Sequence, residues 1–186
     1  MVNEVIKHLG ILWGRLTGQG IPVTAMWAVD HIVRIVAGAP IRRVSQITPG
    51  LHVGGQYRQR GWERLTARGI TAVVNLRVEY DDEATGIAPQ RYLYLPTIDD
   101  TPPSLEHLRL GVAFITEEVG RGGSVYVHCG SGVGRAPTMA AAYLVSTGLK
   151  PEAAWATIRS VRPFIRPTPR QISQVTRFAE ELDRET

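Results

Sequence analysis

The stretch Val125-Tyr126-Val127-His128-Cys129-Gly130-Ser131-Gly132-Val133-Gly134-Arg135-Ala136-Pro137 decides the fold. Its first residues, apolar and β-branched up to His128, predict a buried strand. A glycine-rich loop follows, and a helix is expected near Ala136, with the next proline tolerated in its first turn. Three glycines stand among the five residues between Cys129 and Arg135. They let the backbone curl until successive N–H groups point inward and form an anion site at a helix N-terminus.

Two side chains in this loop predict a reaction centre. Cys129 stands at the loop entrance, where inward N–H dipoles, the helix N-terminus and a nearby arginine favour the nucleophilic thiolate. Arg135 closes the loop six residues later and can bind two oxygens of a phosphoryl group with its planar fork. The backbone between them is predicted to bind the phosphate, through Gly130, Ser131, Gly132, Val133 and Gly134.

The alternative interpretation of Cys129 is a buried and inert thiol, which is the usual fate of a lone strand-end cysteine. The adjoining His128, the glycines and the strand–loop–helix context together favour the catalytic interpretation. Cys129 is the only cysteine in 186 residues, which excludes an internal disulfide and a multi-cysteine metal cluster. A single reactive thiol is typical of a reducing compartment, and we expect a cytoplasmic protein.

The formal net charge is +4, and Lys7 and Lys150 are the only lysines among 21 basic residues. Arginine suits phosphate recognition better than lysine does, although a solvated arginine-rich surface would give the same composition. No basic run is dense enough for a nucleic-acid arm, so no nucleic-acid partner is expected. No uninterrupted apolar span reaches the ~20 residues that a transmembrane helix needs.

Strands and helices alternate along the chain and predict an α/β fold with a central, mostly parallel sheet flanked by helices. Short strands are expected at 44–47, 51–53, 70–76, 92–95 and 124–128. Helices are expected at 62–68, 105–119, 136–146, 151–161 and 170–182, the second of them capped by Ser104. These elements define a catalytic domain over residues 41–186.

Residues 1–40 are predicted to form an N-terminal helical extension. Helices are expected at 2–16 and 24–37, separated by a break that contains glycine and proline. The main interpretation is a helical appendage packed on the domain. The alternatives are an interfacial membrane helix, anchored by Trp13 and Trp27, and a partner-binding element.

The loop from His128 to Arg135 resembles the signature of the protein tyrosine phosphatase superfamily, particularly its small dual-specificity branch. The resemblance extends from about Ile47 to Leu182 and includes Val73-Val74-Asn75-Leu76-Arg77 in the buried strand. It implies the cysteine-phosphatase fold and hydrolysis of a phosphomonoester through a phospho-cysteine intermediate, without a cofactor. Residues 1–40 match no family pattern.

The resemblance also implies a general acid about thirty residues before the cysteine. Asp99 matches the family position best, because it directly follows the apolar Ile98. Asp100 is the alternative, and a third interpretation is that both carboxylates only cap the turn before Pro102. The same aspartate would later activate water against the phospho-cysteine.

One position departs from the family pattern, which usually has Ser or Thr directly after the arginine to stabilise the departing thiolate. Here that residue is Ala136. The Gly-Arg-Ala-Pro run resembles the phosphatases of regenerating liver, which are slow enzymes. A slow second step is therefore expected, unless Thr138 or a water molecule substitutes.

Further residues are given supporting roles. His128 is expected to orient the cysteine loop by hydrogen bonding, and Arg166 and Gln171 either border the mouth of the site or are surface residues. The acidic cluster at 79–83 is interpreted mostly as a solvated loop that edges the cleft. The remaining histidines lack metal-ligand spacing, so no metal is predicted.

The expected substrate is a phosphorylated protein or a small phosphomonoester, because the loop lacks the lysines that inositol-lipid phosphatases often carry. The alternative is a phospholipid or phosphoinositide phosphatase in peripheral membrane contact through residues 1–40. The chain resembles mitochondrial phosphatidylglycerophosphate phosphatase around Thr97-Ile98-Asp99 and Ile165-Arg166-Pro167. A catalytically weak phosphate-binding module is the third possibility, and Ala136 is the feature that supports it.

Overall fold

The sheet is built from five strands in one α/β domain. The structure, a computed structural model, describes the backbone of residues 2–185 and the side chains of residue 10 and residues 12–184. The strands lie in the order β1-β2-β5-β3-β4. They are β1 (Gln46–Thr48), β2 (Leu51–Gly55), β3 (Ala72–Arg77), β4 (Arg91–Thr97) and β5 (Val125–Cys129). Only β1 and β2 pair antiparallel, so the predicted α/β class with a mostly parallel sheet is confirmed.

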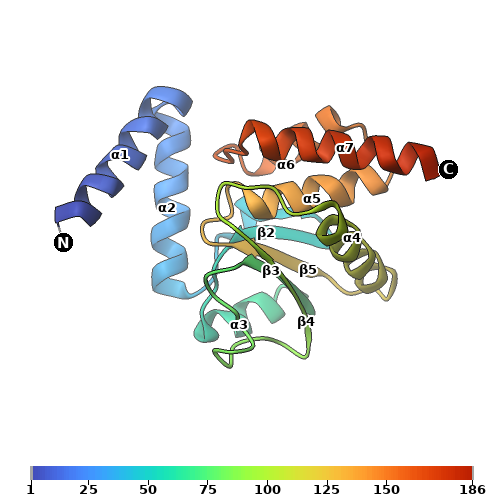
Figure 1. Cartoon of the computed structure of the whole chain (residues 1–186). Helices are drawn as coiled ribbons and strands as arrows, with labels where there is room; N and C mark the ends of the chain where they lie inside the picture. Colours follow the sequence, from blue (N-terminus) through green and yellow to red (C-terminus); the bar gives the residue numbers. More distant parts are fainter. Residues whose placement is uncertain (1, 186) are drawn as a thin grey trace.

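Helices cover both faces of this sheet (Figure 1). One face carries α4 (Leu105–Gly120), α5 (Arg135–Ser146), α6 (Pro151–Val161) and α7 (Pro169–Glu185), and the other carries α3 (Gln59–Thr66). Ser104 caps α4 as predicted, because its Oγ accepts a hydrogen bond from the His107 N–H at 3.0 Å. At the remaining end of the molecule stand α1 (Val2–Gln19) and α2 (Ile21–Ala37).

Two expectations about element boundaries are wrong. Residues 42–44 form a 3-10 turn, and the first strand begins only at Gln46. The turn is closed by Ser45, whose N–H and hydroxyl both donate to the Arg42 carbonyl. The break between the first two helices is also shorter than predicted. Gly20, with φ +80°, is the single residue between them, and Pro22 lies within the first turn of α2.

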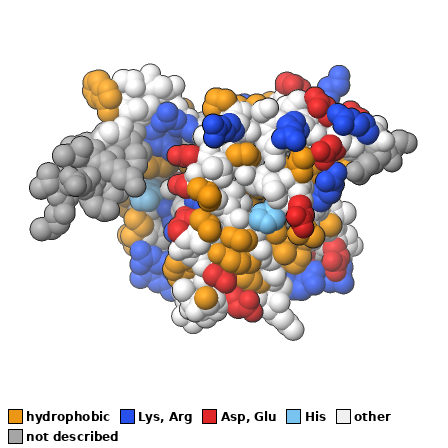
Figure 2. All heavy atoms as spheres, viewed as in Figure 1, with side chains coloured by type: hydrophobic (Ala, Val, Ile, Leu, Met, Phe, Trp, Pro, Cys, Tyr) orange, Lys and Arg blue, Asp and Glu red, His pale blue; other side chains and the backbone are white. Residues whose placement is uncertain are grey.

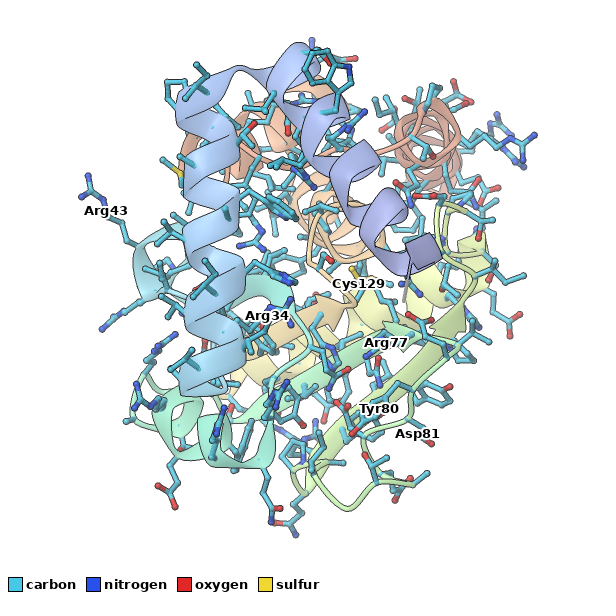
Figure 3. The ribbon with its side chains drawn as sticks, turned by 90° about the vertical axis from the view of Figure 1, so that its left-hand side faces the viewer. Arg34, Arg43, Arg77, Tyr80, Asp81 and Cys129 are labelled. Carbon is cyan, nitrogen blue, oxygen red and sulfur yellow. The ribbon has the colours of Figure 1, made fainter. Side chains whose placement is uncertain are left out.

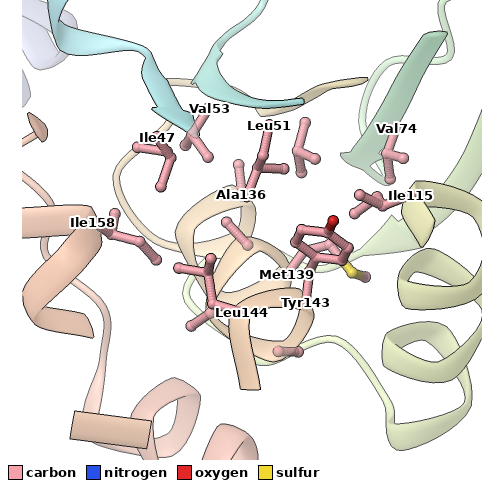
Figure 4. Packing of buried hydrophobic residues seen from close by; sticks show 14 of the residues in the cluster. Ile47, Leu51, Val53, Val74, Ile115, Ala136, Met139, Tyr143, Leu144 and Ile158 are labelled. Carbon is pink, nitrogen blue, oxygen red and sulfur yellow. The ribbon is translucent and has the colours of Figure 1, made fainter. Parts of the chain in front are cut away.

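Helix α5 is the centre of the main core (Figure 4). Its small residues allow the sheet and three helices to approach closely, and every residue from Arg135 to Val145 is buried. Leu51 and Val53 of β2, Ile115 of α4 and Ile158 of α6 pack around it. This packing fixes the N-terminus of α5 directly behind the glycine-rich loop.

The side chains of β5 alternate between two cores. Val125, Val127 and Cys129 join the cluster around α5. Tyr126 points to the opposite face, into a smaller cluster that includes Tyr57. His128 lies on that same face, since its ring stacks on the Tyr126 ring at a centroid distance of 5.8 Å.

Buried polar groups attach the N-terminal helices to the domain. Asp30 of α2 accepts from the Ile41 N–H at 3.0 Å and lies 3.3 Å from the Arg162 guanidinium. Arg34 donates to the Gln56 carbonyl at 2.8 Å. Arg15 of α1 donates to the Phe164 carbonyl at 3.2 Å. The orientation of the two helices is therefore set by specific hydrogen bonds rather than by a shared apolar core.

Surface charge of both signs is interspersed over the face drawn in Figure 2. Within the described residues, no helix combines the length and the hydropathy that crossing a membrane requires. The outer side of α2 nevertheless exposes apolar side chains, including Val29, Ile32 and Val36.

The buried His52 makes the fold sensitive to acid. Burial, aided by the charges of Arg42 and Arg68, lowers the pKa of His52 from 6.5 to about 4. As the pH falls, His52 takes up a proton in the unfolded chain before it does so in the folded one. The stability that the neutral His52 contributes is therefore fully present above pH 6.5 and is lost as the pH falls toward 4. We expect the free energy of unfolding in urea, followed by tryptophan fluorescence, to fall across this window.

The His52→Gln variant should show a shallower fall over the same window than the wild type. His107→Gln, which removes a histidine near the start of α4, should keep the wild-type slope. Equal slopes for the wild type and the His52→Gln variant would contradict the assignment.

Candidate active site

The loop that follows β5 has all of its carbonyl groups turned outward. Each of the five loop carbonyls, from residue 130 to residue 134, accepts a hydrogen bond from outside the loop. The donors are the N–H of Gln56, the guanidinium of Arg162 for two carbonyls, the N–H of Arg166 and the N–H and hydroxyl of Thr138.

The amides of the same loop face the other way. Within the described part of the chain, no N–H of residues 130–134 donates to a protein acceptor. These amides surround the space between Cys129 and the N-terminus of α5, where their dipoles favour an anion. The loop amides thus face inward, in the arrangement that the glycine spacing predicts for an anion nest.

Gly132 is required by this curvature. It has φ +67°, in the left-handed region that side chains rarely adopt. A Cβ at this position would overlap the Gly54 carbonyl group and lie 2.8 Å from Arg162 Nη2. Gly130, by contrast, has room for a Cβ, whose nearest neighbour would be Arg135 Nη2 at 3.6 Å.

Arg135 is buried and held at the sheet edge by neighbouring strands. Its Nη1 donates to the carbonyls of Leu76 at 3.3 Å and Thr97 at 2.8 Å. Glu79 accepts from both terminal nitrogens, at 2.9 and 3.0 Å. The buried Nε has no partner among the described residues. The guanidinium is therefore fixed in orientation while one N–H remains for a ligand.

Asp99 forms an ion pair with this guanidinium. Its Oδ1 lies 2.9 Å from Arg135 Nη2, and its side chain is 75% exposed. Asp100 adopts φ +59°, and its backbone carbonyl accepts from the Thr168 hydroxyl at 3.3 Å. The structure thus brings Asp99, rather than Asp100, to the arginine of the loop.

The comparison with known proteins identifies the family of the chain. Residues 41–179 match the family described as PTP-SAK, the Swiss Army Knife protein, DSP-PTPase phosphatase domain. The chain belongs to this phosphatase family. The resemblance to the small dual-specificity branch is thereby confirmed.

Individual relatives support the same family. Human dual specificity phosphatase 28 is 31% identical over 140 residues, which cover 74% of this chain and 78% of the relative. Human phosphatidylglycerophosphatase and protein-tyrosine phosphatase 1 is 31% identical over 122 residues, 61% of each chain. The crystal structure of PTPMT1 superposes with a TM-score of 0.68 at 26% identity, over 76% of this chain and 96% of that one. Other relatives are longer, and the chain spans 36% of rat dual specificity protein phosphatase 12.

The loop after β3 of this phosphatase domain, interpreted as mostly solvated, keeps exposed residues but is anchored through Glu79 and Asp82. The hydrogen bonds from Arg135 lower the pKa of Glu79 to about 2, so Glu79 is a carboxylate at neutral pH. Asp82 is fully buried, Tyr80 and Asp81 are half-buried, and Glu79 and Glu83 are exposed. The hydrogen bonds between Glu79 and Arg135 could not be predicted from the sequence, because the acidic residues at 79–83 look like those of an ordinary surface turn.

His128 does not bond to the cysteine loop as expected. Its Nε2 lies 2.7 Å from Asp82 Oδ2, and both side chains are completely buried. The physical reason is strand alternation, which turns the His128 ring to the face of the sheet opposite Cys129. His128 therefore fixes the loop after β3, from which Glu79 reaches Arg135.

The other supporting residues lie around the loop. Gln171 is buried rather than on the surface, next to Gly134, and its amide donates to the Thr101 carbonyl at 2.9 Å. Arg166 is exposed and borders the loop through its N–H, which donates to the Val133 carbonyl at 2.7 Å. The Thr138 hydroxyl donates to the Gly134 carbonyl at 2.9 Å.

Arg162 is the functional residue that sequence reasoning missed. It is fully buried, and its Nε and Nη2 donate to two loop carbonyls, at 2.7 and 3.1 Å. Its position between Val161 and Pro163 gives no periodic signal. Among the described residues, no group of three or more His, Cys, Asp or Glu side chains is placed to hold a metal ion.

Replacing Gly132 with alanine is expected to disrupt the nest. The left-handed backbone and the overlap with Gly54 should destabilise the fold by about 2 kcal/mol or more and displace the loop amides. Vanadate binding, measured by inhibition of para-nitrophenyl phosphate hydrolysis, should weaken at least tenfold. Gly130→Ala is the matched control and should weaken it much less; equal effects of the two substitutions would contradict this account of the loop.

Proposed function

We propose that this protein hydrolyses phosphomonoesters through a phospho-cysteine intermediate, with phosphotyrosine and dual-specificity protein substrates as the first substrate class. The observation that carries the proposal is the ion pair between Asp99 and Arg135, which brings a carboxyl group to the first residue of α5, directly after the loop that follows Cys129. Cys129 would act as the nucleophile, Arg135 as the phosphate clamp and Asp99 as the general acid.

In the first step, the Cys129 sulfur attacks phosphorus and an S–P bond forms as the P–O bond to the leaving group breaks. Asp99 gives its proton to the departing oxygen. The loop amides and Arg135 stabilise the charge on the three remaining phosphoryl oxygens, which is the main requirement of phosphoryl transfer.

In the second step, Asp99 accepts a proton from water while the water oxygen attacks phosphorus. The S–P bond breaks, and inorganic phosphate and the Cys129 thiolate are released. Ala136 offers no hydroxyl to the departing sulfur, and the proton of the Thr138 hydroxyl is directed to the Gly134 carbonyl. We therefore infer that this second step limits turnover.

Substrate binding also prepares the general acid. A phosphate dianion that takes the Nη2 of Arg135 displaces the Asp99 carboxylate and repels its negative charge. The Asp99 carboxyl group would thus be released from the arginine and free to meet the leaving oxygen.

A lipid phosphatase is the second candidate function. PTPMT1, whose structure is similar to this chain, has been crystallised in complex with PI(5)P. The α2 helix supplies a specific feature for it, because Val29, Ile32 and Val36 are 52%, 60% and 68% exposed. Their spacing places them on one side of the helix, where they would dip into the boundary of a bilayer. The dependence on a reduced thiol supports a cytoplasmic location for either function.

The catalytic roles predict distinct kinetics in stopped-flow hydrolysis of para-nitrophenyl phosphate. The wild type should release a burst of nitrophenol followed by slower turnover, and Cys129→Ser should abolish both phases. Asp99→Asn should reduce the burst rate by about 10²–10⁴-fold, the usual contribution of a general acid. Asp100→Asn is the matched control and should stay within about threefold of the wild type, a margin of less than 1 kcal/mol.

Loss of the burst in Asp100→Asn but not in Asp99→Asn would reassign the general acid. An absence of Cys129-dependent release from any phosphomonoester under reducing conditions would leave a phosphate-binding module as the better account.

The lipid candidate predicts binding to vesicles. The wild type should float with vesicles of phosphatidylcholine and phosphatidylglycerol, and the double variant Val29→Asp/Ile32→Asp should not. Leu110→Asp, which changes an exposed leucine on α4, is the control and should float like the wild type. A wild type that stays at the bottom of the gradient would count against the lipid candidate and leave the protein phosphatase.

A further inference from the structure

The N-terminal helices form one wall of a cleft that Ser131 and Val133 of the catalytic loop also line. The cleft has a volume of about 1030 Å³. Arg15 and Trp27 line it from α1 and α2, Asp99 and Ser131 line it from the catalytic loops, and Arg166 lines it from the segment before α7. The wall thus comes from residues before 41, outside the segment that matches the phosphatase family.

Arg15 is a buried cation without a counter-ion among the residues whose side chains the structure describes. Its residue is 4% exposed, and its guanidinium lies over the Trp27 ring at 4.3 Å. It donates to the Gln19 side chain and the Phe164 carbonyl, while its buried Nε has no partner among the described residues. Burial and the positive charges of Arg166 and Arg162 lower the pKa of Arg15 to about 10. A buried charge of this kind is costly unless an anion compensates it.

Arg166 supplies a second cation at the same place. Its backbone N–H is bonded to the Val133 carbonyl, and its Nη1 would lie 3.7 Å from a Cβ built on Gly14 of α1. Within the described part of the chain, neither Arg15 nor Arg166 has a carboxylate in ion-pair distance.

The acidic groups of the cleft do not neutralise this pair. Asp99 is engaged by Arg135 at 2.9 Å, and Asp100, which also lines the cleft, is exposed and forms no ion pair with Arg15 or Arg166. Asp30 is paired with Arg162. Two guanidinium groups therefore face the cleft beside the phosphate loop with their charge uncompensated.

We propose that Arg15 and Arg166 form a second anion site and that the enzyme acts on small phosphomonoesters that carry a second phosphate group. The proposal rests on the phosphatase function of Cys129 and adds a substrate class to it. The phosphate to be hydrolysed would occupy the loop, and the second phosphate, as a monoester or a diester, would bind the two guanidiniums with charge-assisted hydrogen bonds. The cleft volume is close to the ~300–1,000 Å³ typical of sites for small molecules.

The test compares an inositol monophosphate with a panel of inositol bisphosphates as substrates, with phosphate release as the readout. The wild type should prefer at least one bisphosphate by about tenfold or more in kcat/KM, and Arg166→Gln should reduce this ratio about tenfold. Each ratio compares kcat/KM for the two substrates of the same variant, so a loss of activity that affects both substrates equally does not change it. Arg43→Gln is the charge-matched control, because Arg43 is exposed and points away from Cys129 (Figure 3), and it should keep the wild-type ratio.

Arg15→Lys keeps the charge but loses the fork, and it should reduce the ratio less than Arg166→Gln does. If Arg15→Lys does not fold, Arg166→Gln alone decides. A wild type that hydrolyses para-nitrophenyl phosphate but shows no preference for a second phosphate would overturn the site. The loss of all Cys129-dependent hydrolysis would instead overturn the phosphatase function.

Two further arms identify the source of the second phosphate. A short-chain phosphoinositide that is hydrolysed faster than its free headgroup, with the same dependence on Arg166, would support a lipid-borne substrate. Equal rates for both would support a free one. Dependence on Arg166 with a doubly phosphorylated peptide alone, and with no inositol bisphosphate, would overturn the small-molecule proposal in favour of a peptide.

Discussion

The catalytic loop depends on one buried guanidinium, that of Arg162. A charge taken out of water must be paired or fully hydrogen-bonded. Arg162 meets this need with the carbonyls of Ser131, Gly132 and Val44 and with the Asp30 carboxylate, and its guanidinium also lies over the Phe164 ring. Burial lowers its pKa, while Asp30 favours its charged form. Because these bonds turn two loop carbonyls outward, the amides beside them turn inward, and the anion nest follows.

A second buried pair orders the opposite side of the site. His128 and Asp82 bond at 2.7 Å below the sheet, and Asp82 also accepts from the Gln56 side chain at 2.7 Å. This anchors the loop after β3, so that Glu79 meets the Arg135 guanidinium with both oxygens. The Arg135 guanidinium is therefore oriented through a chain of contacts that begins on the face of β5 away from Cys129.

Whether a feature of the site could be predicted from the sequence depends on how far apart along the chain its interacting residues lie. The strand, loop and helix around Cys129 are local features, specified by the glycine spacing and by apolar runs, and they could be predicted. Arg162, Glu79 and Asp82 act through partners 26 to 132 residues away. Nothing in their immediate neighbours separates them from surface residues. The length of the break at Gly20 could not be predicted for a related reason, since glycine and proline mark a break without giving its length.

The attachment of residues 1–40 shows why the edge of a family match need not be the edge of a functional unit. The extension reaches the domain through Arg15, Asp30 and Arg34, all buried, and keeps much of its apolar surface on the outside. Buried polar pairs add little net stability compared with apolar packing, but they tolerate only one geometry. An appendage that served stability alone would bury its Val29 and Ile32 side chains against the domain. Here the polar contacts fix α1 and α2 beside the phosphate loop, which is what a wall that selects substrates requires.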